Sequence, residues 1–379
     1  MYSEIIKKSA VFSSSDIFQT MNDIRVYKSR ITYLEKLWNK FENYEFSAEL
    51  HRNMHENFKN QMIHIASCGS FLTFRTLESD NTVGKLSNGS FCRQRICPLC
   101  QRRRSLKLFS NIQQMLEPIK NKYAFLHLTL TVPNVNVADI RSQITHLFES
   151  SKMLFNTPAI KKAFKGVIRS LEVTYNKDTE LLHPHLHCLV LVNKSYFTSR
   201  DYIKFEDLRE IWGDIIGVCN PQIHIRKCDD LVSALREVVK YASKPIDTHS
   251  EDIDGFDDFQ ALLYYMYIGY ALKSRRLLQC FGICAELSKA FHIDLNNDEI
   301  EPATPEYTQP QYYCYNRNTR KFENNYSLSE ETSSPDYKNS FHNQQLKIIH
   351  SQAEERKREK IRHNADYALK VLMRKKNEE

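Results

Sequence analysis

The segment HPHLHCLVLV, residues 183–192, sets a histidine at every second position and then continues as an apolar run. Alternate side chains of a β-strand lie on one face, with Cα atoms roughly 6.8 Å apart, so two neighbouring imidazoles can bind one metal ion. The outer histidines would lie roughly 13–14 Å apart, too far to share that ion comfortably. Pro184 lacks an N–H group and suits the start of a strand, which makes His183 the marginal member. We therefore predict that His185 and His187 are the ligand pair.

The strand predicted before this segment, GVIRSLEVTY at residues 166–175, carries Glu172 near its centre. An acidic side chain is rare inside a strand unless it has a partner or a function. If the segment NKDTELL closes a hairpin, Glu172 lies opposite His185 in an antiparallel register, with Cβ atoms roughly 5 Å apart. Two imidazoles and one carboxylate form a ligand set that suits Mg²⁺ or Mn²⁺. His183 could replace Glu172 as the third ligand, and the alternative without a metal is hydrogen-bonded histidines with Glu172 paired to an arginine.

Three closely spaced cysteines form a C-x4-C-x2-C array, made of Cys92, Cys97 and Cys100. This spacing is typical of cysteines that bind structural zinc, which takes four ligands in a tetrahedron. Cys68 is the candidate for the fourth ligand, because Gly69 allows a turn after it, and His64 is the alternative. Buried cysteines without a metal are the competing interpretation. The chain holds 10 cysteines and no apolar leader segment, which favours reduced thiols and metal sites over disulfides.

A run of basic residues surrounds the cysteine array, consisting of Arg93, Arg95, Arg102, Arg103, Arg104 and Lys107. No acidic residue interrupts this run, and an exposed charged face is its ordinary interpretation. Guanidinium groups held by a zinc-braced loop can also pair with phosphates through two parallel hydrogen bonds. The formal net charge of +7 is compatible with polyanion binding without requiring it. We predict that this run contacts DNA.

The segment DLVSALREVVKYASKP, residues 230–245, has the spacing of an amphipathic helix. Its apolar stripe consists of Leu231, Ala234, Leu235, Val238 and Ala242. Glu237 and Tyr241 are four residues apart, so they lie one above the other, and Lys244 follows on the same side before Pro245 ends the helix. A tyrosine can attack a phosphodiester when a metal, a lysine or a base lowers the cost of ionising it. The alternative is an ordinary amphipathic helix.

Sequence patterns divide the chain into four segments. Residues 1–60 have a helical pattern and are predicted to form an N-terminal helical arm, and residues 61–115 are predicted to form a zinc-binding, basic DNA-binding module. From 116 to 295, apolar strands alternate with amphipathic helices, which predicts an α+β domain. The composition of residues 296–379 predicts a linker and a charged helical tail. The chain has only 9 glycines and no glycine-rich phosphate loop, which argues against a nucleotide-driven enzyme.

Four motifs occur in an order that resembles the HUH endonuclease superfamily: FCRQRICPLCQRRR, FLHLTLTVPN, HPHLHCLVL and EVVKYASKP. Over about residues 62–290, the set is similar to the rolling-circle replication initiators of bacterial plasmids, in the branch with one tyrosine and one glutamate. The resemblance implies a Rep-type central antiparallel sheet flanked by helices. It implies that Tyr241 nicks one DNA strand and forms a 5′-phosphotyrosine bond, and that Glu237 directs water at termination. Glu172, His185 and His187 would hold the catalytic metal.

The resemblance also implies that the partner is plasmid origin DNA, double-stranded and single-stranded, with Mg²⁺ or Mn²⁺ for catalysis and Zn²⁺ for structure. A host helicase, a host polymerase and a second copy of the chain are compatible further partners. No apolar run approaches the ~18–20 residues of a membrane span, so the expected location is cytoplasmic and membrane partners are not expected.

Other functions are compatible with parts of this pattern. A relaxase or a single-strand transposase of the same superfamily is one alternative, although relaxases usually carry the tyrosine before the histidines and transposases are usually shorter. A non-catalytic zinc-dependent DNA-binding repressor is another. Such a repressor would need neither the histidine pair nor Tyr241.

Overall fold

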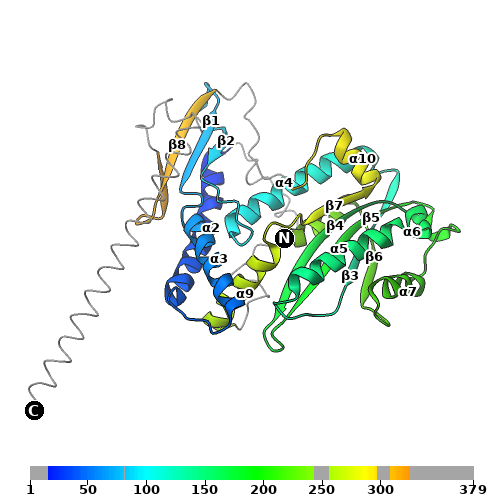
Figure 1. Ribbon diagram of the computed structural model, residues 1–379. Coiled ribbons are helices and arrows are strands. Elements are labelled where there is room, and N and C mark those ends of the chain that lie inside the picture. Colours follow the sequence, from blue (N-terminus) through cyan, green and yellow to red (C-terminus); the bar gives the residue numbers. More distant parts are fainter. Residues whose placement is uncertain (1–15, 81, 243–255, 297–307, 325–379) are drawn as a thin grey trace, which may run out of the picture.

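The structure is a computed structural model that describes residues 16–80, 82–242, 256–296 and 308–324, apart from five side chains in the helix at 231–242 (Figure 1). Its helices are α2 (Ile17–Phe41), α3 (Glu49–Ala66), α4 (Pro98–Leu116), α5 (Ile140–Asn156), α6 (Pro158–Ala163), α7 (Phe205–Ile216), α8 (Leu231–Ala242), α9 (Asp258–Leu272) and α10 (Ile283–Ala290). Its strands are β1 (Phe71–Thr76), β2 (Gly84–Gly89), β3 (Tyr123–Thr131), β4 (Phe164–Asn176), β5 (Leu181–Asn193), β6 (Ile223–Cys228), β7 (Leu278–Gly282), β8 (Gln309–Asn316) and β9 (Lys321–Asn324). Two antiparallel sheets are flanked by helices, so the predicted α+β class is confirmed.

The larger sheet has the strand order β6-β3-β5-β4-β7, and every neighbouring pair is antiparallel. Its centre is the β4–β5 hairpin, whose turn begins at Asn176. The side chain of Asn176 accepts hydrogen bonds from the main-chain N–H groups of Asp178 and Thr179, which is the usual role of asparagine in a tight turn. In this hairpin Glu172 lies opposite His185, so the predicted hairpin and its register are confirmed.

Both faces of the larger sheet are covered by helices. On one face, Leu186 and Val190 of β5 belong to the main core, to which α5 and α7 also contribute. On the other face, Leu189 and Leu191 pack in a second core with α4, α8 and α10. Figure 1 shows α5 lying across one side of the sheet. Because β5 is buried on both sides, its second half is apolar at consecutive positions.

The smaller sheet has the order β2-β1-β8-β9, and its last two strands correct a prediction. We expected residues 296–379 to form a linker and a tail, but 309–316 and 321–324 are strands that extend the sheet from β1. The alternating tyrosines of β8 fit a half-buried strand, with Tyr313 buried and Tyr315 half-buried. Asn316 closes the hairpin by accepting from two main-chain N–H groups. We did not predict this strand because the Asn- and Pro-rich composition of the segment is typical of a linker.

The described part of the predicted N-terminal arm is largely helical, but α2 and α3 pack into the main core rather than extending from it. They bury Ile24, Ile31, Leu34, Met54, Phe58 and Ile65 there. α9 contacts α2, α3 and β4, and it joins this part of the chain to the larger sheet (Figure 1). Its sequence, DFQALLYYMYIGYAL, is apolar on all sides, as expected for an enclosed helix. None of the helices in the described ranges is both long enough and apolar enough to span a membrane.

Candidate metal centres and the tyrosine helix

The side chains of Glu172, His185 and His187 meet on one face of the larger sheet. The Nε2 atoms of His185 and His187 lie 2.8 Å and 2.9 Å from the same oxygen, Oε2 of Glu172. All three residues are less than a tenth exposed. The candidate ligand atoms all lie within 4.8 Å of one another. The β4–β5 register therefore brings together the three residues that the sequence singled out.

The spacing of this cluster fits a hard divalent cation. Mg²⁺ binds oxygen at about 2.0–2.1 Å, and adjacent ligands of an octahedron with such bonds lie roughly 3 Å apart. The distances of 2.8 Å and 2.9 Å between the histidine nitrogens and the glutamate oxygen are close to this edge length. Two neutral imidazoles and one carboxylate would leave other coordination positions for water or for substrate oxygens.

The second nitrogen of each histidine ring also has a partner. Nδ1 of His185 lies 3.1 Å from the main-chain oxygen of His183. Nδ1 of His187 lies 3.2 Å from Nε2 of His127 and 3.4 Å from Oγ1 of Thr129, both on β3. Burial, with the nearby imidazole of His187, lowers the pKa of His127 to about 3, so this ring is neutral at pH 7. Such outer partners commonly orient metal-binding histidines.

We did not predict a role for His127 from the sequence. Its signal is the alternation in FLHLTLT, because His127 and Thr129 lie on one face of β3 and Thr129 pairs with His187. The pairing of β3 with β5 cannot be read from local spacing alone.

His183 lies outside the cluster, although it was the alternative third ligand. Its ring centroid is 4.9 Å from that of His185, and burial lowers the pKa of His183 to about 4. The main-chain carbonyl oxygen of His183 lies within hydrogen-bond distance of Nδ1 of His185, whereas the His183 ring packs against the ring of His185. Arg169, the arginine on β4, donates to Ser151 and Gln279 and does not pair with Glu172. The geometry therefore favours Glu172 over His183 as the third ligand.

α8 packs on the face of the sheet that carries the histidines. His187, Leu189 and Leu191 follow one another on this face of β5, and both leucines are buried in the second core. The members of that core from α8 are Leu231, Ala234, Leu235, Val238 and Val239. The described members of the predicted apolar stripe are therefore buried, as expected.

The residues predicted to carry the nucleophilic chemistry belong to the second half of α8 and to the segment that follows it. Glu237 and Tyr241 are positions of this helix, but their side chains are outside the described residues, and Lys244 is outside them altogether. The start of the helix is well defined, because the side chain of Asp230 accepts from the main-chain N–H of Ser233 at 2.7 Å.

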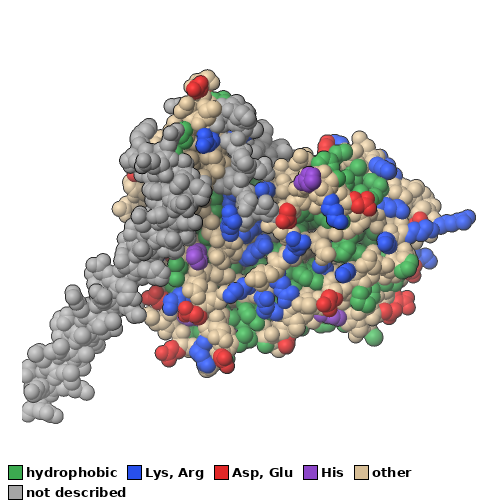
Figure 2. Space-filling view, turned by 45° about the horizontal axis from the view of Figure 1, so that its top comes forward, with side chains coloured by type: hydrophobic (Ala, Val, Ile, Leu, Met, Phe, Trp, Pro, Cys, Tyr) green, Lys and Arg blue, Asp and Glu red, His purple; other side chains and the backbone are tan. Residues whose placement is uncertain are grey.

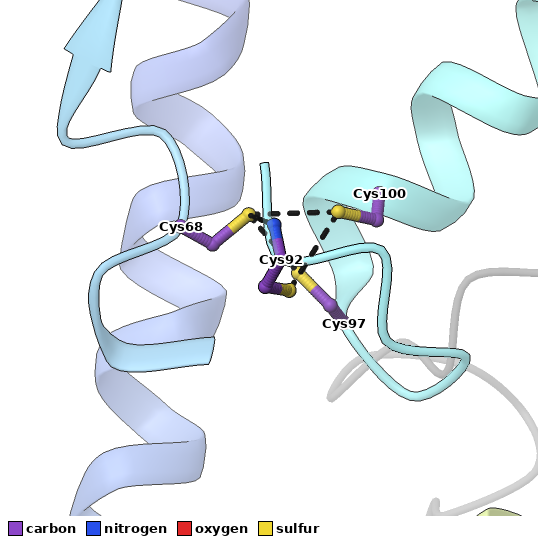
Figure 3. A group of neighbouring side chains, drawn as sticks. All are labelled: Cys68, Cys92, Cys97 and Cys100. Carbon is purple, nitrogen blue, oxygen red and sulfur yellow. Dashed lines mark hydrogen bonds between the residues drawn. The ribbon is translucent and has the colours of Figure 1, made fainter. Parts of the chain in front are cut away.

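Four cysteine sulfurs form a second cluster (Figure 3). The Sγ atom of Cys68 lies 3.5 Å from that of Cys100 and 3.6 Å from that of Cys97, and the sulfurs of Cys92 and Cys100 are 3.7 Å apart. Four Zn–S bonds of about 2.3 Å form a tetrahedron whose edges are roughly 3.8 Å long. The four thiols therefore fit one zinc ion. His64, the alternative ligand, is not a member of the cluster.

Local backbone conformation brings these four sulfur atoms close together. Gly69 has a φ of +68°, which suits glycine and turns the chain directly after Cys68. Its N–H donates to the carbonyl oxygen of Ser90 at 2.6 Å, which ties the first cysteine to the segment that carries Cys92. The sulfur of Cys100 accepts from the main-chain N–H of Arg93 at 3.2 Å. The prediction of a turn at Gly69 is confirmed.

Burial and mutual hydrogen bonds shift the pKa values of three of the clustered thiols in different directions. Burial raises the pKa of the Cys92 and Cys97 thiols well above the usual range, whereas hydrogen bonds from Cys68 and the other thiols hold that of Cys100 well below it. Zinc binds thiolates, so a bound zinc ion would stabilise the charged forms that burial disfavours. Beside the cluster, the buried Lys28 donates to the main-chain oxygen of Cys68 at 2.7 Å.

The basic run predicted to bind DNA lies on the cysteine loop and on the first half of α4. Several of its members have contacts within the protein. The guanidinium group of Arg104 donates to the main-chain oxygens of Arg93 and Gln94, and that of Arg103 stacks 3.7 Å from the ring centroid of Phe91. Figure 2 shows lysine and arginine side chains gathered in the middle of one face of the molecule. DNA binding by this run stays a prediction.

Comparison with known proteins identifies relatives of the chain. A family model described as "Replication protein" matches residues 83–326. A "Protein rep" from Staphylococcus aureus is 34% identical over 223 residues, which cover 57% of this chain and 93% of the relative. A "Protein rep" from Streptococcus pneumoniae serotype 2 is 32% identical over 255 residues, 63% of this chain and 78% of the relative. No solved structure gives a significant match.

The matched region contains both β4 and β5, α8 and three of the four clustered cysteines. These matches confirm the resemblance to replication initiators that the four sequence motifs carry. The chain belongs to the replication protein family.

Proposed function

We propose that this chain initiates rolling-circle replication of a plasmid by cutting one strand of the origin DNA through Tyr241. The observation that carries the proposal is the Glu172–His185–His187 cluster, which lies on the same face of the sheet as α8. Metal ligands and a tyrosine helix on one face are the parts that metal-assisted phosphodiester transesterification needs.

Topology supports a short distance between the end of α8 and the histidines. β6 starts level with the histidines, because His224 pairs with Thr129, which pairs with His187 on its other side. It ends level with Leu191, because both Cys228 and Leu191 pair with Phe125. The strand therefore runs away from the histidine end of the sheet. Two residues separate β6 from α8, so α8 has to run back over the sheet. Its 12 residues extend roughly 18 Å, and the step from Leu191 to His187 is roughly 13 Å. The last turn of α8, with Tyr241, therefore returns toward the histidine end.

In the proposed reaction the phenolic oxygen of Tyr241 attacks a phosphorus atom of the DNA strand. The bond from phosphorus to the 3′ oxygen breaks, the 3′ oxygen takes up a proton, and the 5′ phosphate stays attached to the tyrosine. The phosphodiester energy is kept in the new ester, so the strand can be rejoined without a nucleotide cofactor. A divalent metal bound here would neutralise the developing charge on the phosphate. Glu172, His185 and His187 would hold that metal.

The remaining roles are proposed from the family resemblance and from the chemistry of the residues. Lys244 would lower the cost of ionising Tyr241, and Glu237, one turn before the tyrosine, would direct water at a phosphotyrosine bond to end a round. The zinc-braced basic run would hold origin DNA through its phosphates. A host polymerase would extend the free 3′ end while a host helicase unwinds the duplex.

The test is incubation of the full chain with a supercoiled plasmid carrying its own gene region, with Mg²⁺ or Mn²⁺. We expect a nicked circle with protein attached to the 5′ end. The Tyr241→Phe variant, which lacks only the hydroxyl group, should bind the same DNA and give neither nick nor adduct. Nicking by Tyr241→Phe would refute the assignment of the nucleophile. Binding without nicking by the wild-type chain would instead favour a non-catalytic repressor.

A further inference from the structure

A further histidine, His127, lies next to the proposed metal site and contacts His187. In His187, Nε2 points toward Oε2 of Glu172 at 2.9 Å, and Nδ1 points toward Nε2 of His127 at 3.2 Å. The rings of His127 and His187 are nearly parallel, with an interplanar angle of 11° and centroids 5.3 Å apart. His127 is 4% exposed, so water does not compete freely for this contact.

The chemistry of metal binding determines which atom carries the proton in this pair. A neutral imidazole has one N–H group and one lone pair, on different nitrogens. If Nε2 of His187 gives its lone pair to a metal, Nδ1 carries the proton and has to donate it to an acceptor. Among the described side chains, the acceptors in reach are Nε2 of His127 at 3.2 Å and Oγ1 of Thr129 at 3.4 Å.

We infer that His127 is a positioning residue for the divalent metal, whose Nε2 accepts the Nδ1 proton of His187 and so fixes the tautomer and ring orientation of that ligand. The inference rests on the proposed function, in which the cluster binds a divalent metal. In this arrangement His127 is not itself a metal ligand and acts through His187.

The other histidine ligand gives a useful contrast. Nδ1 of His185 lies 3.1 Å from the main-chain oxygen of His183, so a carbonyl group orients this ring. No side-chain substitution removes that acceptor. The two rings are thus oriented by different devices, one in the main chain and one in a side chain, and the second can be removed by mutation.

The experiment measures Mn²⁺ affinity of the full-length, zinc-containing chain at pH 7.5, from the electron paramagnetic resonance signal of free Mn²⁺. His127→Phe keeps a ring but removes the acceptor, and it should weaken Mn²⁺ binding by roughly 10–100-fold, the usual effect of losing an outer partner. His127→Gln carries an amide oxygen near the position of Nε2 and should bind within about threefold of the wild type, whereas the shorter His127→Asn should resemble His127→Phe.

Two controls decide between explanations. Thr129→Val removes the competing acceptor and should change Mn²⁺ affinity little. A large loss in Thr129→Val with none in His127→Phe would overturn the inference, and so would equal affinities of His127→Gln and His127→Asn. The Gln–Asn pair keeps a polar amide at this site, so the comparison holds even where His127→Phe does not fold. His187→Ala tests the proposed function itself, because unchanged Mn²⁺ binding in that variant would show that the cluster is not the metal site.

Discussion

Gly69 offers a quantitative test of the cysteine loop, because the structure provides a matched control. Gly69 and Gly217 both have a φ of +68°, so alanine at either position has to adopt the left-handed conformation. An added Cβ at Gly69 would lie 2.5 Å from Cδ2 of the buried Leu99 and 3.5 Å from Cγ2 of Ile24. At Gly217 nothing lies within 4 Å of such an atom.

The expected losses in the free energy of unfolding of Gly69→Ala and Gly217→Ala differ by the cost of packing the added methyl group. The left-handed conformation costs an alanine roughly 1–2 kcal/mol, and overfilling a well-packed core costs typically a further 1–3 kcal/mol. Gly217→Ala should therefore lower the free energy of unfolding by about 1–2 kcal/mol, and Gly69→Ala by about 2–5 kcal/mol. Leu99 lies between Cys97 and Cys100 in the sequence, so its displacement should also disturb the zinc ligands.

The assay is urea denaturation of the full chain, followed by circular dichroism, together with release of zinc to a coloured chelator. Gly69→Ala should unfold at lower urea and release zinc faster, whereas Gly217→Ala should release zinc at the wild-type rate. Equal stability losses in the two variants would refute the argument that Leu99 closes the space beside Gly69.

Three further results are expected. Replacing Cys97 and Cys100 by serine should remove the single tightly held zinc ion, measured by elemental analysis, and unfold residues 61–110. A wild-type chain that folds normally without zinc would contradict this prediction. His187→Ala should abolish plasmid nicking while DNA binding is retained. His183→Ala should reduce nicking only slightly, because it keeps the main-chain carbonyl group that faces His185. An equal loss of nicking in the two variants would show that His185 and His187 are not the histidine ligand pair. Glu237→Gln should still nick and form the covalent adduct but accumulate concatenated single strands in a replication assay, and failure at the first nick would mean that Glu237 acts on Tyr241 instead.

The Glu172–His185–His187 cluster could be predicted because its geometry is local. Glu172, His185 and the turn at Asn176 belong to one hairpin, so strand periodicity and turn chemistry set the register. The cysteine array is also local for three of its members. Cys68 was reachable only because Gly69 indicated a turn at the right place.

The parts that escaped prediction depend on pairing between distant segments. β8 pairs with β1 across more than 200 residues of sequence, and Pro, Gln and Asn in this strand resemble a linker when read alone. His127 acquires its contact with His187 only through the pairing of β3 with β5. Periodicity indicates which face a side chain occupies within its own strand, but it does not identify the neighbouring strand.

α4 links the cysteine cluster to the core that contains α8. Its N-cap residue is Cys97, and Cys100 lies in its first turn. Its second half packs in the same core as α8, the helix that carries Tyr241. A helix of 19 residues is roughly 28 Å long and bends little. The basic run on its first half therefore keeps a fixed orientation relative to α8, as long as the cysteine cluster holds the start of α4 in place. In the proposed function, zinc would thus hold the basic run that binds DNA in a fixed orientation relative to α8, which carries the nucleophile Tyr241.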